Sequence, residues 1–240
     1  TAAEHERVVS VTVEVVNKRI PVIAGTGSNS TDEAITFTKH AKTVGADAAL
    51  LITPYYNKPP QEGLYRHFAA VAKAVDLPQI LYNIPGRTSI NMLPSTVSRL
   101  SEIPNIVGIK EGSGSLQQVS DIIQRSHPDF FVLSGDDPLT LPMIALGGKG
   151  VITVTANVAP TDMANMVNAA LEGNYEKARL LHYKLAPLFG ALFLETNPIP
   201  VKAALAMMGK MLEEVRLPLT PLASEFRPKL QEALHQAGVL

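Results

Sequence analysis

The sequence contains no cysteine and no tryptophan, and its charges almost cancel. The lack of cysteine excludes disulfides and metal–thiolate sites within these 240 residues and fits a reducing compartment. The 21 lysines and arginines face 22 acidic residues, so the basic excess of a nucleic-acid binder is missing. No run approaches the ~18 apolar residues of a membrane span. We therefore expect a cytoplasmic protein that binds neither nucleic acid nor membranes.

Several common site motifs are also missing. The six histidines are scattered without the spacing of metal ligands, so we expect no metal site. The sequence has no G-x-S-x-G nucleophile elbow and no G-x-x-x-x-G-K-[ST] phosphate loop. Hydrolase and P-loop chemistry are therefore not indicated.

Short apolar runs alternate with segments of helical periodicity over the first two thirds of the chain. Continuous apolar runs are typical of strands that are buried on both faces, as in a parallel sheet. From residue 161 onward the pattern predicts helices only. The six runs that we expect to be strands are residues 20–27, 48–56, 78–85, 106–111, 130–137 and 150–158.

Two α/β architectures accommodate six parallel strands: a doubly wound open sheet and a (β/α) barrel. The open sheet predicts a glycine-rich phosphate loop after the first strand, but the third glycine is absent after Gly25 and Gly27. The barrel, of the (β/α)8 TIM type with six strands visible, is therefore favoured. We expect residues 1–160 to form the barrel, and residues 161–240 to form its last helix and a C-terminal helical domain.

Two sites in the sequence carry helix-start signals. Ser30, followed by Glu33, has the pattern of a capping box. Asp137, followed by Pro138, has the pattern of an N-cap and first turn. The aspartate is thereby predicted to serve the start of a helix.

The ends of the predicted strands hold the residues that could carry chemistry. Lys110 ends the run 106–111, and strand alternation points its amine into a barrel mouth, where partial desolvation would free it to form a Schiff base. The structural alternative is a rim lysine paired with Glu111. Tyr82, near the end of the preceding strand, could relay protons, or could simply satisfy a hydrogen bond in the core.

Other candidates lie in the loops that follow the strands. Arg87, in a Pro-Gly loop, could bind a substrate carboxylate with its forked guanidinium, although an exposed arginine is often only solvated. Tyr55 and Tyr56 follow the second run and could serve catalysis or an oligomer interface. Gly135 could shape the floor of a pocket.

Five motifs occur in order along the chain: Thr-Pro-Tyr-Tyr-Asn at residues 53–57, Tyr-Asn-Ile-Pro-Gly-Arg-Thr at 82–88, Gly-Ile-Lys-Glu at 108–111, Leu-Ser-Gly-Asp-Asp at 133–137 and Gly-Val-Ile-Thr-Val-Thr-Ala-Asn-Val at 150–158. Together they resemble the dihydrodipicolinate synthase family of class I pyruvate-dependent aldolases. The resemblance implies condensation of pyruvate with L-aspartate 4-semialdehyde to 4-hydroxy-tetrahydrodipicolinate, the first committed step of diaminopimelate and lysine biosynthesis. It implies no cofactor, because the lysine imine itself serves as the electron sink.

The resemblance also implies residue roles. Lys110 corresponds to the lysine that condenses with pyruvate, Tyr82 to a member of the proton relay, and Tyr56 to a tyrosine inserted from a neighbouring subunit. Arg87 corresponds to the arginine that binds the semialdehyde carboxylate. Gly135 and Ile152 correspond to backbone positions that line the pyruvate pocket.

A homotetramer of tight dimers, with feedback by lysine at a subunit interface, is implied as well. The positions that match this allosteric site are His5, Asn29, Glu33 and Tyr55.

Two alternatives remain at this point. One is a related sugar-acid aldolase similar to N-acetylneuraminate lyase, which the Pro-Gly-Arg segment disfavours. The other is an inactive, truncated homologue that acts as an oligomer partner. The sequence matches the family pattern from the second barrel helix onward, without its first two strands and its Gly-Thr-Thr-Gly-Glu loop. We therefore expect low activity from the 240 residues alone.

Overall fold

The computed structural model describes residues 1–240, which divide into two compact units. The first unit comprises residues 1–135 and 146–148, and the second comprises residues 136–145 and 149–240. The boundary expected after residue 160 lies inside the second unit. The division into domains at that residue stays a prediction.

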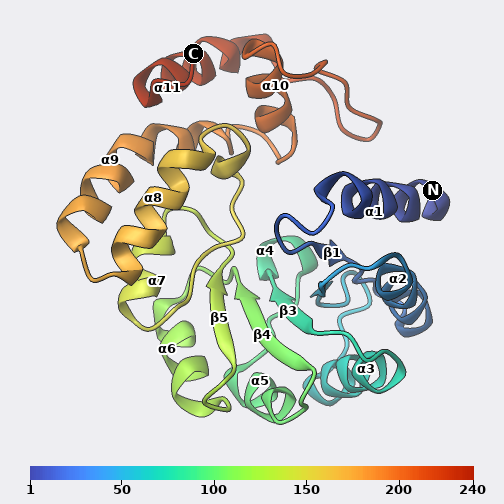
Figure 1. Cartoon of the computed structure of the whole chain (residues 1–240). Helices are drawn as coiled ribbons and strands as arrows, with labels where there is room; N and C mark the ends of the chain where they lie inside the picture. The colour runs from blue at the N-terminus through green and yellow to red at the C-terminus, as the bar shows by residue number, and fades with distance from the viewer. The chain divides into compact units, whose positions relative to one another are not determined.

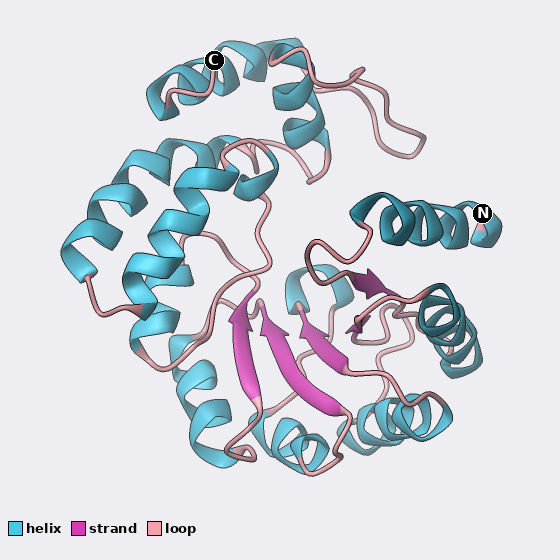
Figure 2. Cartoon of the chain, viewed as in Figure 1, coloured by secondary structure: helices cyan, strands magenta, loops and turns pink.

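A five-stranded parallel sheet organises the first unit (Figure 2). Its strands are β1 (Ile23–Gly25), β2 (Ala48–Ile52), β3 (Gln79–Asn83), β4 (Ile106–Glu111) and β5 (Phe131–Ser134). Their order in the sheet is their order in the chain. A doubly wound sheet reverses its strand order at a switch point, whereas a (β/α) barrel does not. The structure therefore rules out the open-sheet alternative.

Helices follow the strands of this sheet and pack along it (Figure 1). In α3, the fully buried Leu64, Phe68 and Val71 recur at the spacing of one helix face. Each such side chain contributes about 1.5–3 kcal/mol on burial. The helices of the first unit are α1 (Ala2–Val16), α2 (Thr31–Val44), α3 (Gln61–Ala74), α4 (Pro85–Thr88), α5 (Pro94–Ser101) and α6 (Leu116–Arg125).

The second unit is helical, as expected for residues beyond 161. Met163, Met166 and Leu185 are among the fully buried side chains of its core. Its helices are α7 (Thr140–Ala145), α8 (Pro160–Leu171), α9 (Tyr175–Ala191), α10 (Ile199–Met207) and α11 (Arg227–Ala237), with short 3-10 helices at Thr155–Asn157 and Ser224–Phe226. No helix of the chain combines the length and apolar character needed to cross a bilayer.

The sixth expected strand, residues 150–158, is not a strand. Val151 forms only an isolated bridge, and the chain then turns into the 3-10 helix. The backbone N–H of Thr155 donates to the Asp137 carboxylate at 2.8 Å, and the Thr155 hydroxyl donates to the same oxygen at 2.6 Å. The Asp137 side chain thus accepts the backbone N–H that a strand residue would donate to a neighbouring strand.

The same contact corrects the role predicted for Asp137. Helix α7 begins at Thr140, and the carboxylate of Asp137 does not cap it but binds Thr155, which is 18 residues farther along. The Ser30 prediction is half right. Ser30 accepts from the backbone N–H of Glu33, but the Glu33 carboxylate accepts from the Ser28 hydroxyl instead of completing the capping box.

Candidate active site

Lys110 and Tyr82 lie side by side at the carboxyl ends of β4 and β3. They are register partners across the two strands. The Lys110 Nζ atom lies 4.1 Å from the centroid of the Tyr82 ring. Cation–π attraction at this distance stabilises the pair by about 0.5–2 kcal/mol. An amine and a phenol are thereby held where one could form an imine and the other could move a proton.

The Tyr82 phenol is half-buried, and this burial raises its pKa above the usual value of 10. The positive charge of Arg87 opposes the shift. Near neutral pH the phenol therefore keeps its proton and is available as a donor.

Arg87 is exposed and belongs to α4, a single helical turn directly after β3. The Thr88 hydroxyl fastens this turn by donating to the Ile84 carbonyl at 3.0 Å, and it accepts from the Thr53 hydroxyl at 3.3 Å. The turn thus carries the guanidinium on the same edge of the sheet as Lys110 and Tyr82.

The structure does not place Glu111 at the rim beside Lys110, as the alternative interpretation of that lysine required. Its side chain is buried, and alternation along β4 points it to the face opposite Lys110. Its carboxylate accepts hydrogen bonds from the Asn83 amide, the Gln118 amide and the backbone of Ser113. No motif named above indicates this group, although polar residues that end adjacent buried strands, such as Asn83 and Glu111, are a signal for it.

Gly135 lies against the end of β4. Its N–H donates to the Glu111 carbonyl at 2.7 Å. A Cβ at this position would lie 3.1 Å from that oxygen and 3.2 Å from the Gly112 Cα, so only glycine allows this approach without a shift. Ile152 belongs to the second unit, where it is half-buried directly after the Val151 bridge.

Two tyrosines stand out on the loop after β2. Tyr56 is 89% exposed, Tyr55 is 40% exposed, and Tyr56 has a left-handed backbone with a φ of 71°. This conformation is uncommon for a residue other than glycine, and strained positions of this kind concentrate at functional sites. The Tyr56 ring thus projects away from its own unit.

The four residues of the candidate lysine site lie in the first unit, in and around the loop after β1. The His5 Nε2 atom is 2.7 Å from the Gly25 carbonyl, and the Asn29 amide donates to the Tyr55 carbonyl at 3.3 Å. The Glu33 carboxylate, free of the capping role, accepts from Ser28 in the same loop.

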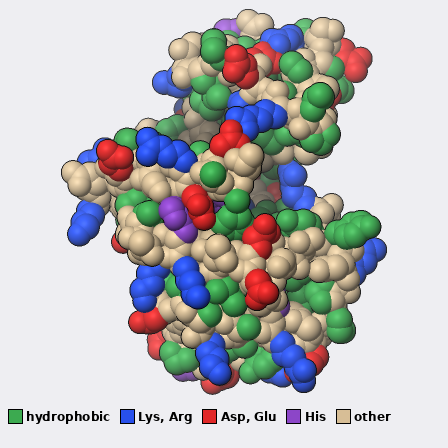
Figure 3. Space-filling model, turned by 90° about the vertical axis from the view of Figure 1, so that its right-hand side faces the viewer, with side chains coloured by type: hydrophobic (Ala, Val, Ile, Leu, Met, Phe, Trp, Pro, Cys, Tyr) green, Lys and Arg blue, Asp and Glu red, His purple; other side chains and the backbone are tan.

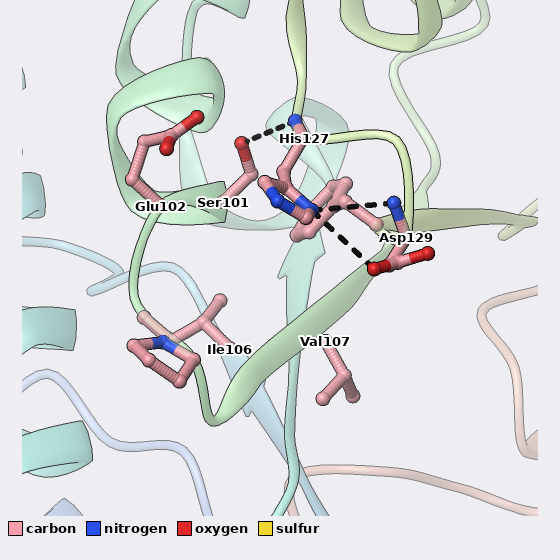
Figure 4. A pocket seen from close by; sticks show the side chains of 8 residues that line it. Ser101, Glu102, Ile106, Val107, His127 and Asp129 are labelled. Carbon is pink, nitrogen blue, oxygen red and sulfur yellow. Dashed lines mark hydrogen bonds and ion pairs between the residues drawn. The ribbon is translucent and has the colours of Figure 1, made fainter.

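A pocket of about 340 Å³ opens at the other end of β4 (Figure 4). Ile106, the first residue of this strand, lines it together with Ser101 and His127, and the Ser101 hydroxyl accepts from the His127 backbone at 2.9 Å. None of the predicted site residues lines it. No group of three or more histidine and acidic side chains in the chain is placed to hold a metal ion. On the face drawn in Figure 3, positive and negative side chains are interspersed.

Residues 1–237 match the model of the dihydrodipicolinate synthetase family. The chain belongs to this family. It is 61% identical to a 4-hydroxy-tetrahydrodipicolinate synthase of Thermodesulfovibrio yellowstonii, over 99% of this chain and 81% of that protein. The resemblance inferred from the five motifs is therefore confirmed.

Solved structures of the dihydrodipicolinate synthetase family share the fold. The chloride-inhibited dihydrodipicolinate synthase of Acinetobacter baumannii, complexed with pyruvate, is 50% identical with a TM-score of 0.98, over 100% of this chain and 82% of that chain. The enzyme of Cyanidioschyzon merolae with lysine bound is 45% identical with a TM-score of 0.97, over 100% and 82% of the two chains. The TIM-barrel fold class is thereby confirmed. This close match gives no support to the expectation of low activity.

Proposed function

We propose that the protein condenses pyruvate with L-aspartate 4-semialdehyde to form 4-hydroxy-tetrahydrodipicolinate, a step of diaminopimelate and lysine biosynthesis. The observation that carries the proposal is the Lys110 amine, 4.1 Å from the Tyr82 ring centre, in a chain 61% identical to a synthase of this name. A lysine and a proton donor at neighbouring strand ends are what Schiff-base chemistry requires.

In the proposed reaction, the Lys110 amine attacks the pyruvate carbonyl carbon and water leaves, so that a C=N bond replaces the C=O bond. Loss of a methyl proton gives an enamine, whose carbon attacks the aldehyde of the second substrate. The amine of that substrate then attacks the imine carbon, closes the ring and releases Lys110 as a free amine. The lysine imine holds the electrons, and neither a metal nor an organic cofactor takes part.

Each neighbouring side chain has one role in this scheme. Tyr82 passes protons to and from the carbinolamine oxygen, and its raised pKa keeps the resting phenol protonated. Arg87 binds the carboxylate of aspartate semialdehyde through its forked guanidinium. Gly135 contributes backbone to the pyruvate pocket.

Steady-state kinetics with two substrate pairs tests the proposed reaction. The protein should consume pyruvate and aspartate semialdehyde together and should not cleave N-acetylneuraminate, because Arg87 suits a short amino-acid semialdehyde. Cleavage of the sugar acid without condensation would favour the aldolase alternative. Absence of both activities from folded protein would favour the inactive oligomer partner.

A homotetramer of tight dimers, in which Tyr56 reaches the site of a neighbouring subunit, is part of the proposal. The exposed ring and left-handed backbone of Tyr56 support it.

Feedback by lysine, at a site formed by His5, Asn29, Glu33 and Tyr55, is a further part of the proposal. The proposed location of the enzyme is the cytoplasm. Sedimentation should give four subunits, and added lysine should inhibit the wild type but not a Glu33→Ala variant. A sedimenting monomer would contradict the tetramer, and equal inhibition of both proteins would contradict the lysine site.

A further inference from the structure

We propose that Glu111, Asn83, Asn91 and Gln118 form a positioning network that keeps Tyr82 opposite Lys110. The inference rests on the proposed function, because it concerns the geometry of the same site. None of the four side chains is assigned to the reaction itself. They lie behind the site, and they act through the strands that carry the amine and the phenol.

The network begins at the residues directly after the reactive pair. Asn83 follows Tyr82, Glu111 follows Lys110, and the two are register partners across β3 and β4. The Asn83 amide donates to the Glu111 carboxylate at 3.0 Å and to the Asn91 amide oxygen at 2.8 Å. Each bond crosses from one segment to another, so the network joins the two strand ends to the segment after α4.

Gln118 closes the network from α6. Its amide nitrogen donates to Asn91 at 3.0 Å and to Glu111 at 3.3 Å, and its oxygen accepts from Asn91 at 2.8 Å. The second carboxylate oxygen of Glu111 accepts from the Ser113 backbone at 2.6 Å. The buried carboxylate thus accepts from three N–H donors.

The pairing between β3 and β4 contains an irregularity that lies before the reactive pair. The register shifts between Gln79 and Ile80, because Gln79 pairs with Ile106 but Ile80 pairs with Gly108. Such an irregularity disrupts the ladder locally. A slip of one residue would turn Lys110 to the opposite face of the sheet. The Asn83–Glu111 bond lies beyond the irregularity and fixes the pairing at the strand ends.

The network also reaches the segment that follows Arg87. The Asn83 oxygen accepts from the backbone of Met92 at 3.0 Å, and the Asn91 carbonyl accepts from Gln61 of α3 at 2.8 Å. One set of hydrogen bonds therefore fixes both ends of the segment that starts at Tyr82 and carries Arg87. The network therefore positions the segment that carries Arg87 as well as the two strand ends.

The test measures the rate of imine formation in single turnovers, with pyruvate added and the imine trapped by borohydride at short times. The variants are Glu111→Gln, which turns one acceptor into a donor that faces other donors, and Gln118→Met, which removes three hydrogen bonds at nearly constant size. The control is Glu62→Gln, the same chemical change on α3, where Glu62 makes exposed ion pairs with Arg66 and Arg99.

At a temperature well below the unfolding midpoint of each protein, both network variants should form the imine about 10- to 100-fold more slowly, as a misplacement of about 1 Å predicts. The control should stay within about twofold of the wild type, because exposed ion pairs contribute little. A purely structural network would lower the midpoints and leave the imine rate of the folded protein unchanged, and that result overturns the proposal.

Two further outcomes are informative. If Glu111→Gln does not fold, the rate of Gln118→Met decides the question by itself. If the wild type forms no imine, the proposed function is wrong and the positioning role falls with it, whereas wild-type imine formation with unchanged variant rates refutes the positioning role alone.

Discussion

His67 provides a quantitative test of the packing in the first unit. The side chain is 6% exposed on α3, its Nδ1 lies 2.9 Å from the Thr31 hydroxyl, and its Nε2 has no partner. Burial lowers the pKa of this imidazole from 6.5 to about 4. The folded state therefore holds His67 neutral at a pH at which the unfolded chain has already taken up a proton.

The magnitude follows from this difference in pKa. Because the unfolded state binds the additional proton, stability falls as the pH drops through the unfolded pKa of 6.5, and the loss is complete below the folded pKa of about 4. A shift of about 2.5 units corresponds to about 3 kcal/mol. We expect His67→Asn to be less stable than the wild type at pH 8, but to lose about 3 kcal/mol less between pH 7 and pH 4.

Urea unfolding at a series of pH values measures this slope. The matched control is Phe68→Leu, which weakens the same helix at the neighbouring buried position without removing a titrating group. Its stability curve should run parallel to the wild-type curve at a lower level. Parallel curves for the wild type and His67→Asn would refute the account of a buried neutral imidazole.

Three further predictions follow from the other side chains. Arg87→Ala should reduce kcat/KM for aspartate semialdehyde by about 2–4 kcal/mol, or roughly 30- to 1,000-fold, while imine formation with pyruvate persists; Arg66→Ala is the control, and equal loss of both steps would contradict the role. Asp137→Ala should cost about 2–5 kcal/mol of unfolding free energy, because both Thr155 donors lose their acceptor. The control is Asp162→Ala, which breaks the half-exposed ion pair with Lys184 and should cost about 0–1 kcal/mol. Equal losses in the two variants would count against the Asp137–Thr155 contact. Mixed subunits of Tyr56→Phe and Lys110→Ala should regain activity, since a hybrid site holds both intact residues, and the lack of any gain after proven subunit exchange would place Tyr56 within its own chain.

Local patterns were sufficient to predict the parallel sheet and the pairing of Lys110 with Tyr82. Five apolar runs became strands, because a strand buried on both faces leaves a continuous apolar signal in the sequence. Lys110 and Tyr82 end neighbouring runs, so their proximity follows once the strands lie in chain order.

The errors arose where a distant side chain outweighed the local pattern. The apolar pattern of residues 150–158 predicted a strand, but the Asp137 carboxylate accepts the Thr155 N–H. The same aspartate was predicted to cap a helix only because Pro138 follows it. The network around Glu111 joins residues 83, 91, 111 and 118, which have no common periodicity. Only the folded arrangement brings these four side chains together.

The most direct test of the central claim is borohydride reduction in the presence of pyruvate, followed by peptide mass spectrometry. The account predicts one reduced pyruvate unit on the peptide that contains Lys110, and no adduct in Lys110→Ala. It also predicts that reduction without pyruvate leaves this peptide unmodified. An adduct on another lysine, or an unchanged yield from folded Lys110→Ala, would contradict the assignment of Lys110 as the Schiff-base residue.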